Sequence, residues 1–389
     1  MQKGEKQQMH AARILMIALV ICAMAWISYL FNYSYHPPTE EQDELFLFNN
    51  SSIIHNETEI ANFQNESVQV PNFIPESCTH FSALYAQIDE DFAPLVNATF
   101  TWNVDKCKDQ CLGLKIVANT VEQVFSRNPW QSRHENFLKL INQVLQVHSI
   151  PDIDLMIIHT GDIPTNQTYP FFCINRAADP ICILCPDFTF VNRKEAKLED
   201  SWHETLEHLK NASIQYKFET RNDTAIWRGN NLRAEYEGGH RAILVELSEE
   251  HPNELDAKFV NFKGQGDGLK HYMPITNFCR YKYLIHTNGI SYSSRLKYLM
   301  ACKSLVFFPK SEYREYWYHL LEDGHNIVSV TANFSDLIPK LQQAKRNDSH
   351  AANENAGKLV EQYLNMDAVL CYWAVILRRY ANLLKNMNI

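Results

Sequence analysis

The chain has 389 residues, which is enough for one large domain or two domains of medium size. Hydrophobic residues make up 46% of it and charged residues 21%, so most of the chain can bury a core. The formal net charge is −9, which argues against a general nucleic-acid binder, because phosphates are met by a basic surface. A local basic pocket for a single phosphate ligand stays compatible with this charge.

The N-terminus predicts a membrane anchor. Residues 14–31 contain no charge and are just long enough to cross a bilayer as a helix. Residues 1–13 contain Lys3, Lys6 and Arg13 against the single acid Glu5, which predicts a cytosolic tail and a single-pass, type II topology. The alternative is a cleaved signal peptide, since Ala23-Met24-Ala25 fits a cleavage site. Both interpretations send the remainder to the secretory pathway, and we expect a lumenal domain in the Golgi or endoplasmic reticulum.

Glycosylation signals and cysteines agree with that compartment. Residues 32–77 contain acids but neither Lys nor Arg, which predicts a flexible, glycosylated stem. Ten cysteines are many for a reducing cytosol, and the nine outside the anchor leave at least one without an intramolecular partner. The N-glycosylation sequons are at Asn32, Asn49, Asn50, Asn56, Asn65, Asn97, Asn166, Asn211, Asn222, Asn333 and Asn347.

From Cys78 onward the pattern is that of an α/β fold. Apolar side chains in 135–147 recur along one face of a predicted helix, and 153–159 is an almost wholly apolar predicted strand. Asp162 follows the end of this strand, where open parallel sheets bind their ligands. The second half repeats the alternation, with predicted strands at 242–247, 281–286, 304–308 and 327–330 and predicted helices at 291–302, 312–321, 336–344 and 354–384.

Two segments of the second half carry side chains suited to a phosphate. After a predicted strand, Gly289 is followed by three serines and Arg295 at the start of a predicted helix, where free N–H groups favour anions. Arg295 adds a planar fork that can grip a diphosphate at two points. Arg228, between Trp227 and Gly229 at a strand end, could also reach a ligand. Taken singly, these residues are better explained as an ordinary serine-capped helix and a solvated surface arginine.

Other candidate signals point away from a metal. The pair Asp152 and Asp154 has the spacing of a metal-binding signature, but it precedes a strand, so we interpret it as a cap at the strand entry. Cys182 and Cys185 resemble half of a zinc site, yet no second pair has zinc-like spacing, which leaves a loop disulfide or unpaired thiols. The sequence contains no Gly-x-Ser-x-Gly elbow, Walker loop or His-Glu-x-x-His helix.

Taken in order, several short motifs resemble one family. They are Trp227-Arg228-Gly229, His251-Pro252 through Leu255-Asp256-Ala257, Cys279-Arg280-Tyr281-Lys282-Tyr283-Leu284, Asn288-Gly289 through Ser294-Arg295, Ser304-Leu305-Val306-Phe307, and Met366-Asp367-Ala368-Val369-Leu370-Cys371-Tyr372-Trp373. This ordered set resembles the Rumi-type protein O-glucosyltransferases and the capsule-associated xylosyltransferases of glycosyltransferase family 90. The resemblance is strong from about Asp152 to the C-terminus and faint between Cys78 and Ile150.

The resemblance implies a fold, a mechanism and a set of site residues. The expected fold is GT-B-like, with two Rossmann-like domains facing a cleft: residues 78–190 for the acceptor and the base, 191–350 for the donor, and 351–389 as helices packing back. The expected reaction is inverting and metal-independent, with UDP-sugar as co-substrate and no cofactor. Asp162, in Asp162-Ile163-Pro164, matches the family's catalytic base. The donor-site positions fall on Phe188, Thr189, Phe190, Asn222, Arg228, Ile290, Ser291, Tyr292, Ser293, Ser294 and Arg295.

The resemblance also implies disulfide pairs. Cys279 with Cys302 matches a paired position of the family, Cys78 with Cys371 would tie the start of the domain to its last helix, and Cys107 with Cys111 is the third expected pair. The C-terminus lacks the retrieval signal of the family's soluble members.

The sequence therefore predicts a transferase that moves glucose or xylose from a UDP-sugar to a hydroxyl of a protein or glycan. Two alternatives stay open: a metal-dependent transferase of another fold that uses Asp152 and Asp154, and a non-catalytic lumenal sugar-binding protein or chaperone on the same fold.

Overall fold

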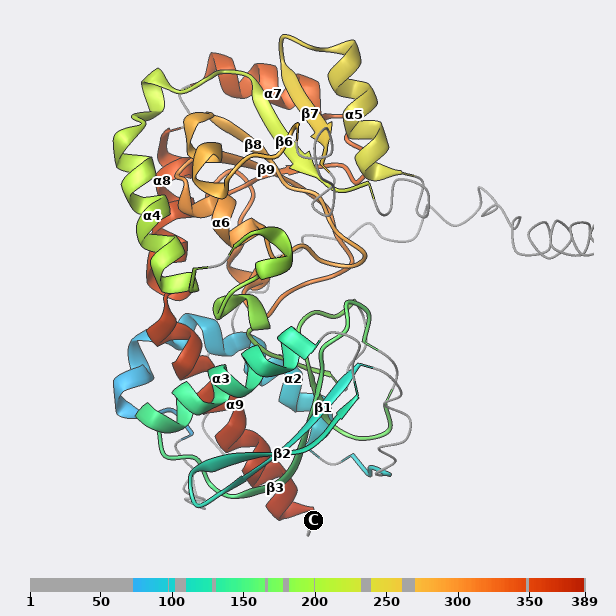
Figure 1. Cartoon of the computed structure of the whole chain (residues 1–389), viewed down its shortest axis with the longest axis vertical. Helices are drawn as coiled ribbons and strands as arrows, with labels where there is room; N and C mark the ends of the chain where they lie inside the picture. Colours follow the sequence, from blue (N-terminus) through green and yellow to red (C-terminus); the bar gives the residue numbers. More distant parts are fainter. Residues whose placement is uncertain are drawn as a thin grey trace, which may run out of the picture. The chain divides into compact units, whose positions relative to one another are not determined.

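Two five-stranded sheets, both within the compact unit Val70–Ile389, form the framework of the protein in the computed structural model (Figure 1). The structure describes residues 73–96, 98–101, 110–127, 131–164, 167–177, 182–198, 200–231, 239–260, 270–347 and 350–387. The predicted anchor at 14–31, almost all of the predicted stem, and Cys107 lie outside these ranges. Within them, no helix combines the length and the apolar character that crossing a membrane requires.

The first sheet is mixed, with the strand order β2-β1-β3-β4-β5. Its antiparallel part is a hairpin of β1 (Cys111–Val117) and β2 (Thr120–Arg127), with β1 also antiparallel to β3 (Ile153–His159). Its parallel part continues from β3 to β4 (Phe171–Cys173) and β5 (Cys182–Leu184). The carboxyl ends of β3, β4 and β5 consequently meet at one edge, which is where ligands bind in open α/β sheets.

The hairpin turn is tied to the helix that covers the sheet. Ala118 and Asn119 both have positive φ, 48° and 59°, as a tight two-residue turn requires. The Asn119 amide donates to the Leu145 carbonyl at the end of α3 (Gln131–Val147), at 2.6 Å. Asp152 Oδ1 accepts the Ala118 N–H at 2.8 Å, so the acid expected to cap the strand entry binds the neighbouring turn.

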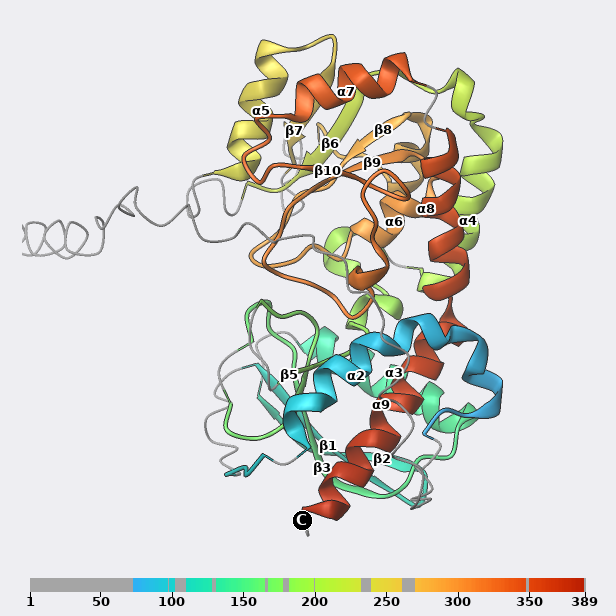
Figure 2. The ribbon, with the colours of Figure 1, turned by 180° about the vertical axis from the view of Figure 1, so that it is seen from behind.

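Helices from the two ends of the described chain pack on this sheet. Helix α3 contacts β2 and also α9 (Met366–Asn386), which returns from the second half of the chain. The helix α2 (Ala86–Phe92), which follows the 3-10 helix η1 (Glu76–Tyr85), contacts β5. Figure 2 shows α9 running along the first sheet beside α2 and α3. The C-terminal helix therefore completes the core of the N-terminal half.

The second sheet is wholly parallel, with the order β10-β9-β8-β6-β7. Its strands are β6 (Ala225–Gly229), β7 (Leu255–Phe259), β8 (Tyr283–Ile285), β9 (Leu305–Pro309) and β10 (Val328–Val330). Helices cover both faces: α5 (His240–Glu250) and α7 (Leu337–Arg346) on one, and α4 (Trp202–Gln215), α6 (Leu296–Ala301) and α8 (His350–Tyr363) on the other (Figures 1 and 2). This is the doubly wound, three-layer arrangement of a Rossmann-like fold.

Several predicted elements are confirmed, two are wrong and one helix is shorter than predicted. The strand at 153–159 and the helix over 135–147 are present, as are strands close to 281–286, 304–308 and 327–330. The predicted strand 242–247 is instead part of α5, because Leu244 and Ser248, four residues apart, turn to the core. The predicted helix 291–302 starts only at Leu296.

The third difference is the predicted helix 312–321, which is largely irregular. Arg314 forms an antiparallel bridge with Arg176, with backbone hydrogen bonds of 2.9 and 3.2 Å between them. A chain segment cannot give its N–H and C=O groups both to this partner and to its own helix. Only the 3-10 turn Tyr318–Leu320 forms here, and the segment links the two halves of the unit.

Three disulfides lie wholly within the described residues. Cys78–Cys371 and Cys279–Cys302 form as predicted. Cys173–Cys182 joins β4 to β5, while Cys185 is free and buried. Cys111 is disulfide-bonded as well, but its predicted partner lies outside the described residues.

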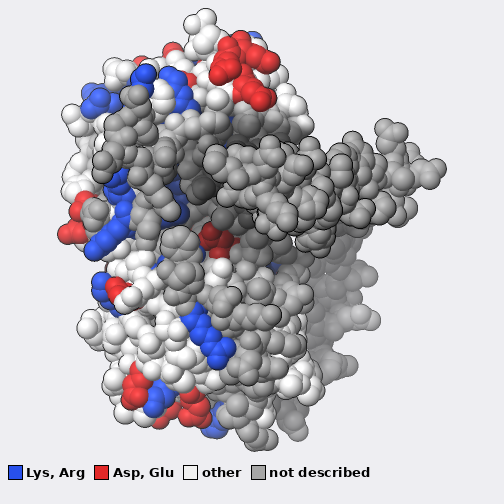
Figure 3. Space-filling view, turned by 45° about the vertical axis from the view of Figure 1, so that its right-hand side comes forward, with Lys and Arg blue, Asp and Glu red and all other residues white. Residues whose placement is uncertain are grey.

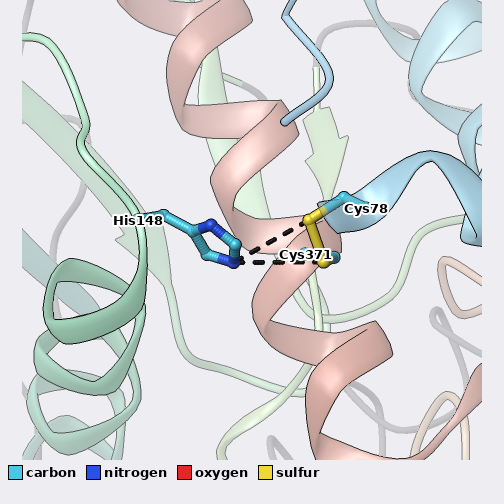
Figure 4. A group of neighbouring side chains, drawn as sticks. All are labelled: Cys78, His148 and Cys371. Carbon is cyan, nitrogen blue, oxygen red and sulfur yellow. Dashed lines mark hydrogen bonds between the residues drawn. A yellow bond between two sulfur atoms is a disulfide. The ribbon is translucent and has the colours of Figure 1, made fainter. Parts of the chain in front are cut away.

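His148 packs against the longest crosslink. Its Nε2 atom lies 3.8 Å from Cys78 Sγ and 3.9 Å from Cys371 Sγ (Figure 4). Two cysteines and a histidine at this spacing are the ligand types of a zinc site. Sulfur binds zinc as thiolate, however, and these two sulfurs are bonded to each other. The group is therefore a crosslink that pins α9 to η1.

We predict that the two crosslinks differ in their effect on stability. Cys78–Cys371 spans 293 residues and Cys173–Cys182 spans 9. In the chain-entropy model, removing the first costs about 5.7 kcal/mol and removing the second about 2.6 kcal/mol. Urea unfolding of the two double Cys→Ser variants, each against the unsubstituted protein, measures both losses. A smaller loss for the long crosslink than for the short one would contradict the model here.

Candidate functional site

Asp162 lies just beyond the carboxyl end of β3, at the edge where the parallel strands of the first sheet end. Arg133, from the first turn of α3, donates to Asp162 Oδ1 at 3.0 Å and to the Thr160 carbonyl at 2.7 Å. The Asp162 side chain is 33% exposed, so the carboxylate is held on one side and open to solvent on the other. The Asn175 amide donates to the Asp162 carbonyl at 2.8 Å, which fixes the backbone beneath it.

A tight loop from the second sheet reaches Asp162. Residues 289–295 follow β8, and the Gly289 N–H donates to the Tyr292 carbonyl at 3.0 Å. A Cβ at Gly289 would lie 2.6 Å from that carbonyl oxygen, so the turn requires glycine. The Ser291 hydroxyl donates to the Asp162 carbonyl at 2.5 Å. The structure therefore brings together the residues that the resemblance assigned to the base and to the donor loop.

Three guanidinium groups gather at this loop, and we name Arg193, Arg241 and Arg295 the arginine cluster. Arg193 donates to Ser294 Oγ at 2.6 Å, and Arg241 donates to the Asn288 carbonyl at 2.7 Å. Arg295 donates to the carbonyl of Arg228. No carboxylate of the described residues forms an ion pair with any of the three. Their partners are neutral oxygens.

The pKa values record this concentration of positive charge. Burial, and then repulsion by Arg241 and Arg193, lowers the pKa of Arg295 to about 9. Burial and Arg193 lower the pKa of Arg241 to about 10. His286, fully buried at the end of β8, has its pKa held well below its ordinary value by burial and by Arg295 and Arg241. An anion placed here would relieve the repulsion, so the cluster is suited to bind a phosphate group.

Arg228 differs from the cluster because it already has a counter-charge. It donates to Asp256 Oδ2 at 2.5 Å and to the Asp256 carbonyl at 2.7 Å, across the neighbouring strand β7. Burial acts to raise the pKa of Asp256, but bonds to Arg228 and Lys258 outweigh it, so that pKa lies below its ordinary value. Through its carbonyl, Arg228 also holds Arg295. In this state its main contribution is to support the cluster.

Four other predicted donor residues do not face the arginine cluster: three lie in the core, and one lies at the opposite end of the second sheet. Phe188, Thr189 and Phe190 form the 3-10 helix η4 and are buried, with the Arg133 guanidinium 4.7 Å over the Phe188 ring. They precede Arg193 in the chain, and because they are buried they offer little surface to a ligand. Asn222 precedes β6, at the opposite end from Gly229, where its side chain accepts the Thr224 N–H at 2.8 Å. The structure does not bring Asn222 to the arginine cluster.

The acid pair of the metal-dependent alternative is also apart from the site. Asp152 and Asp154 lie at the amino end of β3, whereas Asp162 follows its carboxyl end. They line a cavity of about 680 Å³ with residues of α9. Asp152 already accepts the Ala118 N–H, so this member of the pair caps a hairpin turn.

Sequence reasoning missed Arg133, Arg193 and Arg241. Arg193 sits in a run of polar residues that looks like a solvated loop, and Arg241 sits in a segment predicted as a strand. No local pattern distinguishes either from an ordinary surface arginine, since only the fold places them beside the 289–295 loop. Among the described residues visible in Figure 3, basic and acidic side chains form small separate groups.

Comparison with known proteins identifies the family of the chain. The model of "Glycosyl transferase family 90" matches residues 75–388. The chain belongs to this family. As a family 90 member it is a glycosyltransferase, which requires a sugar donor and an acceptor.

Its relatives carry names of the same class. Protein O-glucosyltransferase 1 of Mus musculus is 26% identical over 337 residues, which cover 80% of this chain and 83% of that protein. The Rattus norvegicus protein of the same name is 28% identical over 61% of this chain and 64% of its own length. O-glucosyltransferase rumi of Drosophila melanogaster is 28% identical over 61% of this chain and 62% of that protein. The chain thus spans less than two thirds of some of these relatives and more of others.

Solved structures are more distant. The Anabaena protein HepE, in complex with UDP and glucose, aligns with a TM-score of 0.30 at 15% identity and covers 46% of this chain and 52% of that chain. A glycosyltransferase from Rickettsia africae aligns with a TM-score of 0.27 at 14% identity, over 48% of this chain and 46% of that chain.

A second group of charged side chains is buried behind the site. Asp187, Lys297 and Glu315 are all enclosed, with two carboxyl groups and only one ammonium. Burial, followed by repulsion from Asp187, raises the pKa of Glu315 to about 8. Glu315 therefore carries its proton at neutral pH, which balances the charge of this group.

We predict that Glu315 makes stability fall as the pH rises. Between its ordinary pKa of 4.5 and about 8, the folded protein keeps the Glu315 proton that the unfolded chain releases. The unfolding free energy must then decrease with pH through this window. Glu315→Gln should flatten the decrease, while Glu246→Gln, at an exposed position of α5, should leave it unchanged. Urea unfolding at several pH values tests this, and equal slopes for the Glu315→Gln and unsubstituted proteins would refute it.

Proposed function

We propose that this glycosyltransferase moves glucose or xylose from a UDP-sugar to a hydroxyl of a protein or glycan acceptor. The observation that carries the proposal is the arginine cluster, which lacks a carboxylate partner among the described residues and adjoins Asp162. A diphosphate would place two anionic groups among three guanidinium groups, whose planar forks match phosphate oxygens at two points. The names of the O-glucosyltransferase relatives support the sugar.

The proposed mechanism separates a proton acceptor from a leaving-group site. Asp162 accepts the proton of the acceptor hydroxyl as that oxygen attacks the anomeric carbon. UDP leaves with growing negative charge, which Arg193, Arg241 and Arg295 stabilise together with the loop hydroxyls of Ser293 and Ser294. Attack from the Asp162 side and departure on the cluster side invert the anomeric carbon in one displacement. In this proposal guanidinium groups supply the positive charge, so transfer needs no metal and no cofactor.

We also propose the larger arrangement that this reaction requires. The two sheets would be a GT-B-like pair of domains, 78–190 and 191–350, with 351–389 as helices packing back; the contacts of α9 with α3 and η1, and of α8 with α6, support this. Ile290 and Tyr292 would shape the donor loop, and Asn222 would contribute only after a rearrangement. The uncharged run 14–31 and the sequons support a type II anchor and a lumenal domain in the Golgi or endoplasmic reticulum.

We predict that Asp162→Asn abolishes transfer and leaves UDP binding nearly intact. The amide keeps the shape of the carboxylate but cannot accept the proton, and the bond from Ser291 goes to the Asp162 backbone, which the substitution retains. A transfer assay and calorimetry with UDP on the same folded variant separate the two effects. If Asp162→Asn kept transfer and EDTA removed it, the metal-dependent alternative would replace this one. If the unsubstituted protein bound UDP but transferred no sugar to any acceptor, a non-catalytic role would follow.

For the arginine cluster, we predict that Arg295→Ala and Arg241→Ala each weaken UDP binding and transfer together. Each loses a charged hydrogen bond of about 1.5–3 kcal/mol, which corresponds to about tenfold to a hundredfold in affinity. Arg295→Lys should recover little, since one ammonium cannot reproduce a two-point grip. Arg346→Ala, at an exposed position of α7, serves as the matched control and should bind UDP normally. Unchanged UDP affinity in both cluster variants would overturn the proposed donor site.

A further inference from the structure

We infer that Asp187 is a positioning residue that holds the two halves of the donor site together, namely the segment 188–193 and the loop 289–295. The inference rests on the proposed function, because it concerns the site in which UDP would bind. Asp187 does not face that site. It lies in the core beneath it, 1% exposed, and acts through the hydrogen bonds that it accepts.

One carboxylate oxygen organises the first segment. Asp187 Oδ1 accepts the Thr189 N–H at 3.1 Å and the Thr189 hydroxyl at 2.6 Å. Asp187 thereby caps the 3-10 helix η4, whose last turn closes with the Val191 N–H donating to the Phe188 carbonyl at 3.1 Å. Arg193 follows this turn by two residues, so the cap fixes the backbone from which the first arginine of the cluster extends.

The other oxygen holds the second segment. Asp187 Oδ2 accepts the Tyr292 hydroxyl at 2.7 Å, and Tyr292 is nearly fully buried in the middle of the loop. On one side of it, Ser291 donates to the Asp162 carbonyl, and on the other, Ser294 accepts from Arg193. A single carboxylate thus fixes the loop that touches the proposed base and carries Arg295.

The surroundings keep this carboxylate in place. Lys297, 1% exposed, has its Nζ atom 3.6 Å from Asp187 Oδ1 and donates to Thr189 Oγ1 at 2.5 Å. The same ammonium lies 4.3 Å from the centre of the Phe190 ring. A buried carboxylate is costly unless it is paired and hydrogen-bonded, and this one accepts three hydrogen bonds beside one ammonium. Such a network stabilises the fold weakly compared with apolar packing, but it specifies one geometry.

Loss of the Asp187–Tyr292 bond would therefore disturb the site more than the fold. The loop 289–295 would keep its glycine turn and its helix α6, but its position relative to Arg193 would no longer be fixed. UDP binding depends on the spacing between Arg193 and Arg295, whereas the core is held by many other contacts.

The test is Tyr292→Phe, which removes only the hydroxyl that binds Asp187. We expect the affinity for UDP to fall about tenfold, as for loss of one hydrogen bond to a charged group. The matched control is Tyr298→Phe, which removes another buried hydroxyl that donates to the same segment, at the Thr189 carbonyl. It should bind UDP normally. Both variants should unfold at similar temperatures, which shows that the difference in affinity is not a difference in folding.

A double-mutant cycle distinguishes positioning from general destabilisation. If Asp187 and Tyr292 act by placing Arg295, Tyr292→Phe should have little further effect on UDP affinity in an Arg295→Ala background. Equal effects in both backgrounds, or equal losses for Tyr292→Phe and Tyr298→Phe, would overturn the inference. These outcomes leave UDP binding itself intact, whereas an unsubstituted protein that does not bind UDP would refute the proposed function instead. Asp187→Asn keeps only one acceptor oxygen, so it loses either the Tyr292 bond or both Thr189 bonds, and its affinity for UDP should fall at least as far as that of Tyr292→Phe.

Discussion

Three like charges held side by side are the constraint around which this site is built. Guanidinium groups repel one another, and this repulsion adds to burial, the larger cause, in lowering the pKa values of Arg241 and Arg295. The chain holds them with neutral oxygens, which orient a guanidinium without cancelling its charge: the Asn288 and Arg228 carbonyls and the Ser294 hydroxyl. A carboxylate in their place would stabilise the empty site and compete with any anionic ligand. Arg228 is the exception, because it forms an ion pair with Asp256 and its charge is already balanced.

The same region joins the two sheets. Ser291 reaches the Asp162 backbone, Tyr292 reaches Asp187, and Arg314 pairs its backbone with Arg176. Each contact crosses from the second sheet to segments that follow strands of the first, so the place where the halves meet is also the place where the polar groups converge. In open α/β sheets this convergence has a simple origin, because all parallel strands end at one edge. The loops that carry the polar groups of the site are therefore also the loops that join the two sheets.

Local patterns predicted much of the framework. The apolar run of β3, the amphipathic α3 and the long C-terminal helices have strong periodicity, and each is present. The errors occurred where long-range contacts outweigh local preference. The segment 242–247 is helical because it covers the second sheet, and 312–321 is irregular because its backbone is bound to Arg176. The disulfides Cys78–Cys371 and Cys279–Cys302 followed from the resemblance, whereas Cys173–Cys182 required the pairing of β4 with β5.

For the site, the sequence by itself determined Asp162 after a strand, Gly289 in a turn, and Arg295 beyond it, since these depend on neighbours along the chain. It also determined membership of a family whose motifs occur in a fixed order. Only the tertiary structure brought Arg133, Arg193 and Arg241 to those residues, placed Asn222 at the opposite end of β6, and enclosed Asp187 between the segments it holds. The physical reason is that an arginine or a carboxylate acts through a charge, and the partners that fix these charges lie 29 to 105 residues away, a distance that no local pattern records.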